Sequence, residues 1–479
     1  MPIADPVLAL DLGTTGVRAV VFDGEGHKVG QAYRRLDMQY PTPDRVEQDA
    51  RQFHALGVEV MREALATSKV PARDLRGLGI VSQRGSAVAW DARTGQPLAP
   101  VIGWQDRRTL ARVTELRELG IPVNTLAACT KFEWLLTQDA VRAAADAGTL
   151  RLGTPDAWLS WTLSGGEAFV TDPSNAGATG LYDPASGGWF DMALGLFGQE
   201  LGWHAGLVAT DAVVGVLDDA VLGAPVPLAA RAGDQQAACF AQGVDRPGAA
   251  KVTLGTSAML DRCTGDAPME PPTGAYALPL WRREGVGDAF CLEGTVITAG
   301  AAVEWLIRTG LLASADELDA VAVGGARGVS FVPALAGLGT PWMADRARGR
   351  FDGIGLDTGA AEMVAAVVDG IAQRVTDLAE ALEVEATFGV DGGLGRSDVL
   401  LQRIADLSGR VVARAAETET TARGAAGLAA AAPGTAGGAL PAPAAARRFE
   451  PVMDAATRAA ERARWGTLID GMTQAADAT

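Results

Sequence analysis

The sequence predicts an α/β protein of two large domains, with a similar β-hairpin near the start of each half. The chain has 479 residues, more than one hydrophobic core usually holds. Leu8 to Asp23 contains two apolar runs separated by Gly and Thr residues, which is typical of two strands joined by a turn. Ala250 to Asp261 repeats this pattern and shares the triplet Leu-Gly-Thr. Candidate domains are therefore 1–243 and 244–479, although so short a repeat does not prove duplication.

The turn of the first hairpin has the residue types of an anion-binding loop. Its glycines let the backbone come close to an anion, and the hydroxyls of Thr14 and Thr15 can donate to phosphate oxygens. Arg18, on the second strand, adds a charge-assisted donor. Asp11, at the tip of the first strand, is placed to hold Mg²⁺ directly or through water. Taken alone, this stretch is explained equally well as a plain hairpin with a Gly-rich turn.

The second hairpin strengthens the nucleotide interpretation. Gly255 and Thr256 stand in its turn as Gly13 and Thr14 stand in the first. A nucleoside triphosphate needs donors along its whole length, and two facing hairpins would supply them from both sides. The pair therefore predicts a duplicated architecture that binds ATP between its halves.

The composition argues against several classes of protein. The formal net charge of -17 disfavours nucleic acid as a partner, because the phosphates would be repelled. No apolar run reaches the roughly eighteen residues of a membrane span, and the first residues have neither a basic region nor an apolar signal core. The four scattered cysteines fit small buried side chains better than disulfides or a zinc site. We therefore expect a soluble cytoplasmic protein without membrane or nucleic-acid partners.

The rest of the first half alternates helices and short strands. The periodicity predicts a helix over 51–67, capped by the acidic stretch before it, and a buried strand over 78–81. Gln83 and Arg84 follow that strand and would point hydrogen-bond donors into a cleft at its end, with a surface loop as an equal alternative. Trp104 follows a later apolar run, where it either stacks on a sugar or packs in the core.

An acidic residue near the end of the first half is a candidate catalytic group. Before it we expect helices from 130 and over 156–163, a polar turn over 171–176 and a strand over 225–230. Gly233 then ends the strand, and Asp234 stands at the N-cap of a helix that begins at Gln235. An N-cap carboxylate is ordinarily structural. Between two phosphate hairpins it is also placed to accept a hydroxyl proton, and the helix dipole would keep it ionised.

The second half continues the alternation after its hairpin. A helix that starts with small residues is expected over 298–310, and a Gly-rich loop over 391–397 joins a strand to a helix. Such a loop is a candidate nucleotide site, although alone it is weak evidence. The other expected elements are an amphipathic helix over 363–382, a strand over 388–390, helices over 399–408 and through about 432, a loop over 433–443 and a last helix over 453–472.

A series of motifs runs along the whole chain in a fixed order. They are Asp11 to Thr15 with Arg18 and Asp23, Gln83-Arg84, Trp90-Asp91, Thr94-Gly95, Trp104 with Arg107, Gly233 to Gln236, Leu254 to Ser257, 349–369 and Gly392-Gly393. Each motif is moderately specific, and in this order they resemble the FGGY family of carbohydrate kinases. The resemblance implies an α/β, actin-like fold: two ribonuclease-H-like domains with ATP in the cleft between them.

The resemblance also implies an activity and a role for individual residues. It implies an ATP-dependent kinase that phosphorylates a hydroxyl of a small sugar or polyol, with Asp234 as general base and Asp11 serving Mg²⁺. Acceptor contacts are then expected from Arg84, Gly85, Trp104, Asp234 and Gln235. ATP contacts are expected from Thr14, Thr15, Arg18, Gly255, Thr256, Gly300, Gly393 and Ser397.

Within the family, Gln83-Arg84 and the run from Trp90 to Gly95 look most like the glycerol kinase branch. In that branch the Arg is followed by Glu, and a Tyr precedes the Thr-Lys pair that matches Thr130-Lys131; both side chains contact the acceptor. This chain has Gly85 and Leu126 at those positions. A site that loses two hydrogen-bonding side chains gains volume and discriminates less well for a small triol. A ketose, a pentitol or a tetritol is therefore as good a candidate acceptor as glycerol.

Two interpretations without kinase activity remain open at this level. A non-enzymatic actin-like ATP switch would share both hairpins, but it has no need of Arg84 or Asp234 beside an acceptor pocket. A degenerate kinase homologue that only binds sugar is disfavoured by the intact Asp11 and Asp234. The assembly state is also open, and a homodimer is one compatible arrangement.

Overall fold

The chain folds as two compact units, each assembled from several stretches of sequence. The computed structural model describes residues 3–385, 387–417, 419–435, 437–441 and 445–477. Unit 1 comprises Met1–Ala241, Leu278–Ala289 and Glu419–Ala442, and unit 2 comprises Gln242–Ala277, Phe290–Thr418 and Pro443–Thr479. The structure therefore groups the residues differently from a single division after residue 243, because two later segments fold with unit 1.

Unit 1 is organised around a mixed sheet with the strand order β13-β5-β1-β2-β3. β1, β2 and β3 form an antiparallel meander, whereas β5 runs parallel to β1 and β13 runs parallel to β5. The first hairpin is present as expected, and β3 is a strand that the sequence analysis did not include. The strands are β1 Val7–Leu12, β2 Gly16–Phe22, β3 Lys28–Arg35, β5 Leu78–Ser82 and β13 Leu228–Gly233.

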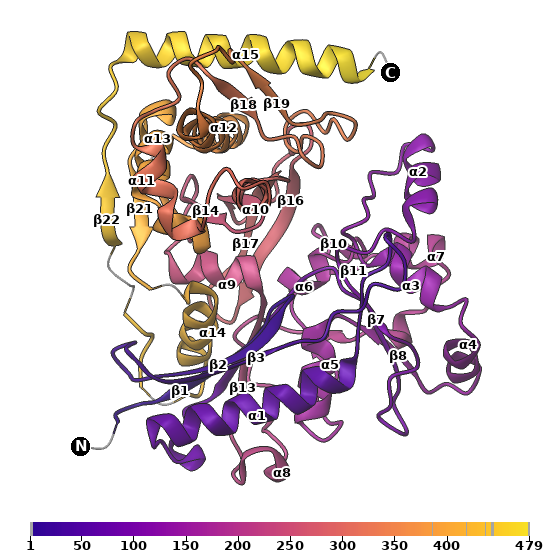
Figure 1. Ribbon diagram of the computed structural model, residues 1–479. Helices are drawn as coiled ribbons and strands as arrows, with labels where there is room; N and C mark the ends of the chain where they lie inside the picture. Colours follow the sequence, from indigo (N-terminus) through magenta and orange to yellow (C-terminus); the bar gives the residue numbers. More distant parts are fainter. Residues whose placement is uncertain (1–2, 386, 418, 436, 442–444, 478–479) are drawn as a thin grey trace. The chain divides into compact units, whose positions relative to one another are not determined.

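Helices cover both faces of this sheet (Figure 1). On one face Leu8 belongs to a buried cluster that includes helix α1 (Ala50–Ser68). On the other face Ala9 belongs to a cluster that includes α14 (Thr420–Ala431), and α14 also packs on α9 (Asp234–Ala241). Because side chains alternate along a strand, β1 contributes to both cores.

A further buried cluster within unit 1 joins Ile102, Phe132 and Leu150. It supports the loops that follow β5 and β7, which carry predicted acceptor contacts. The elements of this part of unit 1 are β4 Glu47–Gln48, η1 Ala72–Asp74, β6 Val88–Asp91, β7 Val101–Ile102, α2 Leu110–Glu118, α3 Cys129–Leu135, α4 Asp139–Asp146, β8 Leu150–Gly153, α5 Pro155–Leu163, β9 Val170–Thr171, α6 Pro173–Gly177, β10 Tyr182–Asp183, β11 Gly188–Trp189, α7 Asp191–Leu196, η2 Leu201–Trp203, β12 Gly206–Leu207 and α8 Asp219–Leu222.

Unit 2 repeats the strand pattern of unit 1. β14 and β15 form an antiparallel hairpin and β15 pairs with β17, whereas β20 runs parallel to β14 and β21 parallel to β20. This repeat of an antiparallel meander followed by parallel strands supports the duplication suggested by the shared triplet. The strands of this sheet are β14 Ala250–Leu254, β15 Ala258–Gly265, β16 Tyr276–Arg283, β17 Gly287–Val296, β20 Phe388–Asp391, β21 Val412–Ala415 and β22 Ala445–Phe449. Most of β16 and the start of β17 belong to the segment Leu278–Ala289, which is grouped with unit 1.

The core of unit 2 forms around the long helix α12 (Ala360–Ala381), which the sequence predicted from its apolar periodicity. The last helix, α15 (Ala455–Asp477), lies near β18 (Ser330–Val332), and its Trp465 and Ile469 share a buried cluster with that strand (Figure 1). The remaining elements are α10 Gly300–Arg308, η3 Ala315–Glu317, α11 Leu318–Ala322, β19 Arg350–Asp352, η4 Gly393–Arg396 and α13 Asp398–Ser408.

The strand before the candidate base lies later in the chain than expected. The expected strand over 225–230 is wrong in its bounds, since β13 covers Leu228–Gly233. Pro225 and Pro227 lack the main-chain N–H that a strand ladder needs, so they precede the strand instead of forming it. Asp234 is accordingly the first residue of α9 and not its N-cap, and the chain passes from strand to helix without a connecting loop.

Two other segments differ from expectation. The predicted polar turn over 171–176 instead contains the short helix α6, whose N-cap Asp172 accepts from two main-chain N–H groups. The strand β22, near the end of unit 2, was not predicted. Of the predicted loop over 433–443, residues 436, 442 and 443 lie outside the described residues.

The described part of the chain contains no helix that is both long enough and apolar enough to cross a membrane. Cys129, Cys239, Cys263 and Cys291 are buried, in agreement with their interpretation as small core side chains.

Candidate active site

Three parallel strands of unit 1 end side by side at one edge of the sheet. Leu12 of β1 is in register with Ser82 of β5, and Ser82 is in register with Gly233 of β13. The first hairpin turn, Arg84 and Asp234 follow directly after these strand ends. Ligands of α/β folds bind beyond the carboxyl ends of parallel strands, so the topology gathers three predicted motifs at such a position.

Arg84 and Asp234 form an ion pair at this edge. Arg84 Nε lies 3.5 Å from Asp234 Oδ1; the Arg84 side chain is 9% exposed, whereas that of Asp234 is 31% exposed. Gly233 makes room for this contact, since a Cβ there would lie 2.6 Å from Arg84 Cδ. The main-chain N–H of Gln235 donates to Asp234 Oδ1 at 2.9 Å. The carboxylate is therefore oriented by its neighbours and still open to an incoming hydroxyl.

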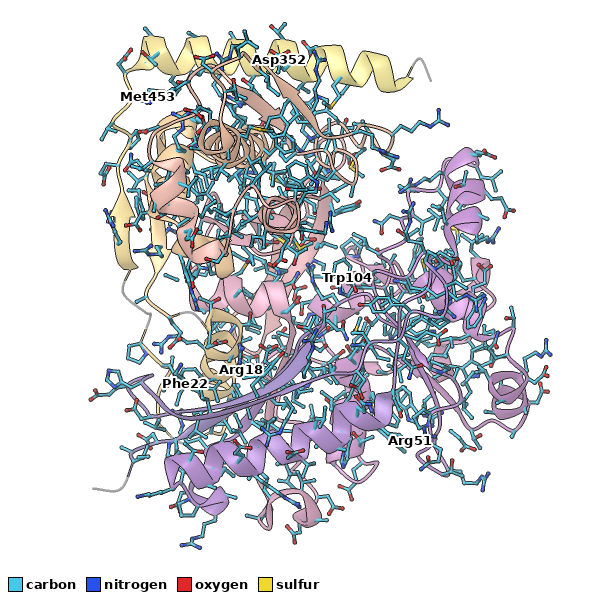
Figure 2. The ribbon with its side chains drawn as sticks, viewed as in Figure 1. Arg18, Phe22, Arg51, Trp104, Asp352 and Met453 are labelled. Atoms are coloured by element: carbon cyan, nitrogen blue, oxygen red, sulfur yellow. The ribbon has the colours of Figure 1, made fainter. Side chains whose placement is uncertain are left out.

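Asp11 stands on β1 opposite Arg18 on β2. Burial raises the pKa of Asp11 to about 7, while Arg18 lowers it and the charge of Asp234 raises it. Arg18, which is labelled in Figure 2, also forms an ion pair with Glu419, next to α14. Its guanidinium lies 5.4 Å from the centre of the Tyr33 ring. A poorly solvated carboxylate that feels a second carboxylate would be stabilised by a divalent cation.

Trp104 connects the predicted acceptor pocket to the first phosphate hairpin. Its indole Nε1 donates to Thr14 Oγ1 at 2.9 Å, and the Gln48 amide donates to the Thr14 carbonyl oxygen at 2.9 Å. Gln83 Nε2 in turn donates to Gln48 Oε1 at 2.8 Å. Gln48 was not predicted as a site residue, because it lies in the stretch before a helix that the sequence analysis interprets as a helix cap. Stacking of Trp104 on a sugar stays a prediction.

A buried polar cluster holds the end of β13 in place. Ser174 Oγ accepts from the main-chain N–H of Gly233 at 2.8 Å and donates to Asp172 at 2.7 Å. Asn175 and Thr210 also donate to Asp172, at 2.9 and 2.8 Å. Burial raises the pKa of Asp172, and these donors oppose that shift. The stretch that the sequence suggested to be a polar turn thus positions the residue directly before Asp234.

Gly85 occupies a turn in which any side chain would be strained. Its φ is +71°, and a Cβ there would lie 2.2 Å from the Leu126 carbonyl oxygen and 3.6 Å from Trp104 Cβ. The loops that carry Gly85, Trp104 and Leu126 therefore converge, as a common acceptor pocket requires. Thr15, predicted to contact phosphate, is exposed in the hairpin turn.

Unit 2 brings predicted ATP contacts together at the end of β14. The Gly300 N–H, at the start of α10, donates to the Gly255 carbonyl oxygen at 2.9 Å. The Thr256 carbonyl oxygen accepts from the N–H groups on either side of Gly300, both at 3.0 Å. A Cβ at Gly300 would lie 2.6 Å from Gly255 O, so the absence of a side chain lets the helix begin against the hairpin. Gly393 follows β20, the parallel neighbour of β14, and is exposed.

Ser397 has a structural partner on each side of its hydroxyl. The hydroxyl donates to Asp319 and accepts from the main-chain N–H of Leu400 at 3.1 Å, which caps α13. The side chain is buried, with 8% relative exposure. A contact between Ser397 and adenine stays a prediction, and the observed role of the hydroxyl is to begin the helix.

The donor set at the Asp11 edge fits Mg²⁺ better than a transition metal. Among the described residues, no group of three or more His, Cys, Asp or Glu side chains is placed to hold a metal ion. Mg²⁺ is commonly bound by one or two carboxylates with phosphate oxygens and water, so it needs no such group. The Asp11 carboxylate is a hard oxygen donor of the kind that this mode of binding uses.

Comparison with known proteins gives a consistent result over the full chain. Residues 6–241 match the N-terminal domain of the FGGY family of carbohydrate kinases, and residues 250–433 match its C-terminal domain. The chain is 39% identical over 486 residues to a glycerol kinase of Aromatoleum aromaticum, covering 97% of this chain and 98% of that protein. It is 38% identical over 495 residues to a glycerol kinase of Dechloromonas aromatica, covering 99% and 98%.

Solved structures show the same architecture. The crystal structure of Plasmodium falciparum glycerol kinase with ADP superposes with a TM-score of 0.88 at 23% identity, covering 98% of each chain. A ligand-bound xylulose kinase from Lactobacillus acidophilus superposes with a TM-score of 0.87 at 19% identity, covering 99% of each chain. At these identities the likeness establishes the fold alone.

The two repeated α/β units have the two-domain, actin-like fold of these solved structures. The chain belongs to the FGGY family of carbohydrate kinases, and its relatives lie in the glycerol kinase branch. It is therefore an ATP-dependent kinase with an alcohol group as acceptor, which confirms the predicted fold class, family and class of enzyme.

Proposed function

We propose that this kinase transfers the γ-phosphoryl group of ATP to a hydroxyl of a small polyol or ketose, with Asp234 as general base. The observation that carries this proposal is the partly exposed Asp234 carboxylate, held by Arg84 and the Gln235 N–H at the strand edge that also carries Asp11. Catalysis of phosphoryl transfer depends mainly on positioning and charge stabilisation. A base fixed in this way accepts the proton of the acceptor hydroxyl as the new P–O bond forms.

The same proposal assigns the other predicted residues to the nucleotide and the metal. Asp11 would hold Mg²⁺ directly or through water, and a bound Mg²⁺ would neutralise charge on the β- and γ-phosphates. The phosphate contacts would come from Thr14, Thr15, Arg18, Gly255 and Thr256. The adenosine contacts would come from Gly300, Gly393 and Ser397.

We infer that the acceptor is larger than glycerol, although the curated relatives are named glycerol kinases. Support comes from Gly85, where the positive φ and the nearby Leu126 carbonyl leave no room for the Glu that the glycerol kinase branch carries. Leu126 likewise cannot donate the hydrogen bond of a Tyr. Without these polar partners, the pocket loses hydrogen bonds that reward a short triol, so discrimination against a longer chain falls.

The test measures ADP release with Mg-ATP and each of glycerol, erythritol, xylitol, D-sorbitol, D-xylulose and D-fructose. Wild-type protein is compared with Asp234→Asn, which removes the base but keeps its size. The control is Asp139→Asn, because the Asp139 side chain is 94% exposed on α4 and belongs to no part of the proposed site. Melting temperatures of all three proteins show whether a loss of turnover reflects unfolding.

We expect one acceptor to stimulate ADP release and Asp234→Asn to lower kcat by roughly 10²- to 10⁴-fold, with Asp139→Asn unchanged. More than about a tenth of wild-type turnover in folded Asp234→Asn would show that Asp234 is not the base. If glycerol had the highest kcat/KM of the six acceptors, the inference that the acceptor is larger than glycerol would be refuted. The assignment of Asp234 as general base would not be affected. ADP release that no acceptor stimulates would instead favour an ATP switch.

We expect the reaction to take place in the cytoplasm, where ATP and Mg²⁺ are available. A homodimer remains the assembly to test, and light scattering at several protein concentrations distinguishes it from a monomer.

A further inference from the structure

The chain contains very few lysines, and half of them are fully buried. Lysine and arginine together number 41, but only Lys28, Lys69, Lys131 and Lys251 are lysines. Lys28 and Lys69 are exposed, whereas Lys131 and Lys251 have 0% relative exposure. Burial of an ammonium group is costly unless its donors are satisfied, so each buried lysine needs a structural explanation. Lys251 has a carboxylate partner, Asp261, at 3.1 Å.

Lys131, on α3, is surrounded instead by main-chain carbonyl groups. Its Nζ donates to Gly85 O at 2.7 Å, to Leu126 O at 3.1 Å and to Trp104 O at 3.3 Å. These carbonyls belong to separate loops: one after β5, one after β7 and one before α3. A single side chain thus joins the loops that carry the predicted acceptor contacts.

The geometry explains why lysine occupies this position in an arginine-rich chain. An ammonium group has three N–H donors on one atom, which match three carbonyl oxygens that converge on a point. A guanidinium group spreads its donors over a planar fork and is larger, so it fits carboxylates better than such a cluster. The contacts of Lys131 therefore depend on both its shape and its protonation.

We propose that Lys131 is a positioning residue for the acceptor: its ammonium group holds together the loops that carry Arg84, Trp104 and Leu126, so that acceptor affinity depends on its charge. The inference depends on the acceptor site proposed above. Loosening these loops would change the relative positions of groups that bind the acceptor. The link from these loops to the proposed nucleotide contacts is indirect, through the indole of Trp104, which donates to Thr14. ATP affinity should therefore change less than acceptor affinity.

The protonation of Lys131 is poised to change near neutral pH. Burial lowers its pKa to about 7, whereas the negative charge of Asp106 opposes that shift. Cys129 stays neutral, because burial raises the pKa of its thiol to about 12; Asp106 is paired with Arg108 at 2.8 Å, and Arg84 on the neighbouring loop stays charged. A neutral amine offers two N–H groups in place of three. One of the carbonyls therefore loses its donor as the pH rises through about 7.

The test compares wild-type protein with Lys131→Met, which keeps the length of the side chain and removes its donors. The control is Glu133→Gln, on the same helix, whose carboxylate faces Arg112 at 3.1 Å. KM and kcat are measured between pH 6 and 9 for ATP and for the acceptor that turns over fastest among the six named above. Asp234→Asn is assayed in parallel, so that failure of the site assignment is recognised separately.

We expect Lys131→Met to raise the acceptor KM on the order of tenfold to a hundredfold while KM for ATP changes less than about twofold. The wild-type acceptor KM should rise roughly two- to tenfold as the pH passes about 7, and this rise should be absent in Lys131→Met. Equal effects on both KM values, or none, would overturn the proposal. If Lys131→Met changes both KM values equally or changes neither, while Asp234→Asn has lost turnover, the proposed function stands and only the role of Lys131 is wrong.

A second measurement covers the case in which Lys131→Met fails to fold. The protein is labelled with ¹³C at lysine Cε, which gives signals from only four side chains. Lys28→Arg and Lys69→Arg identify the two exposed lysines. We expect one of the remaining signals to titrate near pH 7 in the wild-type protein, in step with the acceptor KM. Two buried signals that stay protonated to pH 9 would refute the pH dependence.

Discussion

Asp11→Asn should make this protein more stable at neutral and alkaline pH and at the same time inactive. Burial raises the pKa of the Asp11 carboxyl from 3.8 to about 7, which means that the fold disfavours the ionised form. Ionisation of Asp11 costs no stability below pH 3.8, and its cost grows as the pH rises to about 7, above which it stays constant. Asparagine carries no charge at any of these pH values and avoids that cost.

The size of the effect follows from the change in pKa. A rise from 3.8 to about 7 corresponds to about 4 kcal/mol, at about 1.4 kcal/mol for each pH unit. Asp11 is partly exposed, so solvent screening lowers the gain, and we expect about 1–3 kcal/mol at pH 8. Melting temperatures of domains of about 150–250 residues change by roughly 2–4 °C per kcal/mol. A difference of several degrees between variant and wild type is therefore measurable.

The assay is thermal unfolding of wild-type and Asp11→Asn protein at pH 5, 6, 7 and 8 without nucleotide or divalent metal. The difference in melting temperature should grow with pH up to about 7 and then stay constant. Mg-ATP should stabilise the wild-type protein more than the variant, because the variant lacks the proposed metal ligand. Equal melting temperatures at pH 8, or a less stable variant, would refute the electrostatic reasoning about Asp11.

Three further substitutions test individual contacts. Trp104→Phe keeps an aromatic ring but removes the N–H that binds Thr14, and we expect kcat/KM for both ATP and acceptor to fall roughly two- to tenfold in steady-state assays. Gly85→Ala places a Cβ 2.2 Å from the Leu126 carbonyl at positive φ, so calorimetry should show a loss of stability on the order of 1–3 kcal/mol. Ser174→Ala leaves a buried main-chain N–H without its acceptor, and the same measurement should show a loss of about 1–3 kcal/mol.

Much of the architecture was predictable because it depends on local pattern. The apolar periodicity of the helix over 363–382 and the paired Gly-Thr hairpins are properties of neighbouring residues, and both elements are present. The predicted bounds of β13 differ from the observed ones by three residues. Pro227 has no main-chain N–H to donate to a neighbouring strand, and a prediction based on the apolar run does not take this into account. The segments 278–289 and 419–442 fold with unit 1 for tertiary reasons that no local signal carries.

The candidate site was predictable only in part for the same reason. Arg84 and Asp234 stand at strand ends, a position that sequence patterns indicate, and the strand register places them together. Gln48, Lys131 and Ser174 act through contacts with residues 34 to 59 positions away in the chain. Their roles depend on which loops meet in space, so composition and spacing could not identify them.

Two sets of hydrogen bonds that meet at Trp104 hold the proposed acceptor pocket, and they predict different kinetic behaviour. Trp104 binds Thr14 of the phosphate hairpin, so a change at Trp104 should affect both substrates. The hydrogen bonds of Lys131 described above go to carbonyls of the acceptor loops, so its loss should affect the acceptor more than the nucleotide. If Trp104→Phe and Lys131→Met each changed KM for both substrates equally, the pocket and the hairpin would act as one rigid body. A split between the variants would instead show that the acceptor loops can loosen without disturbing the nucleotide.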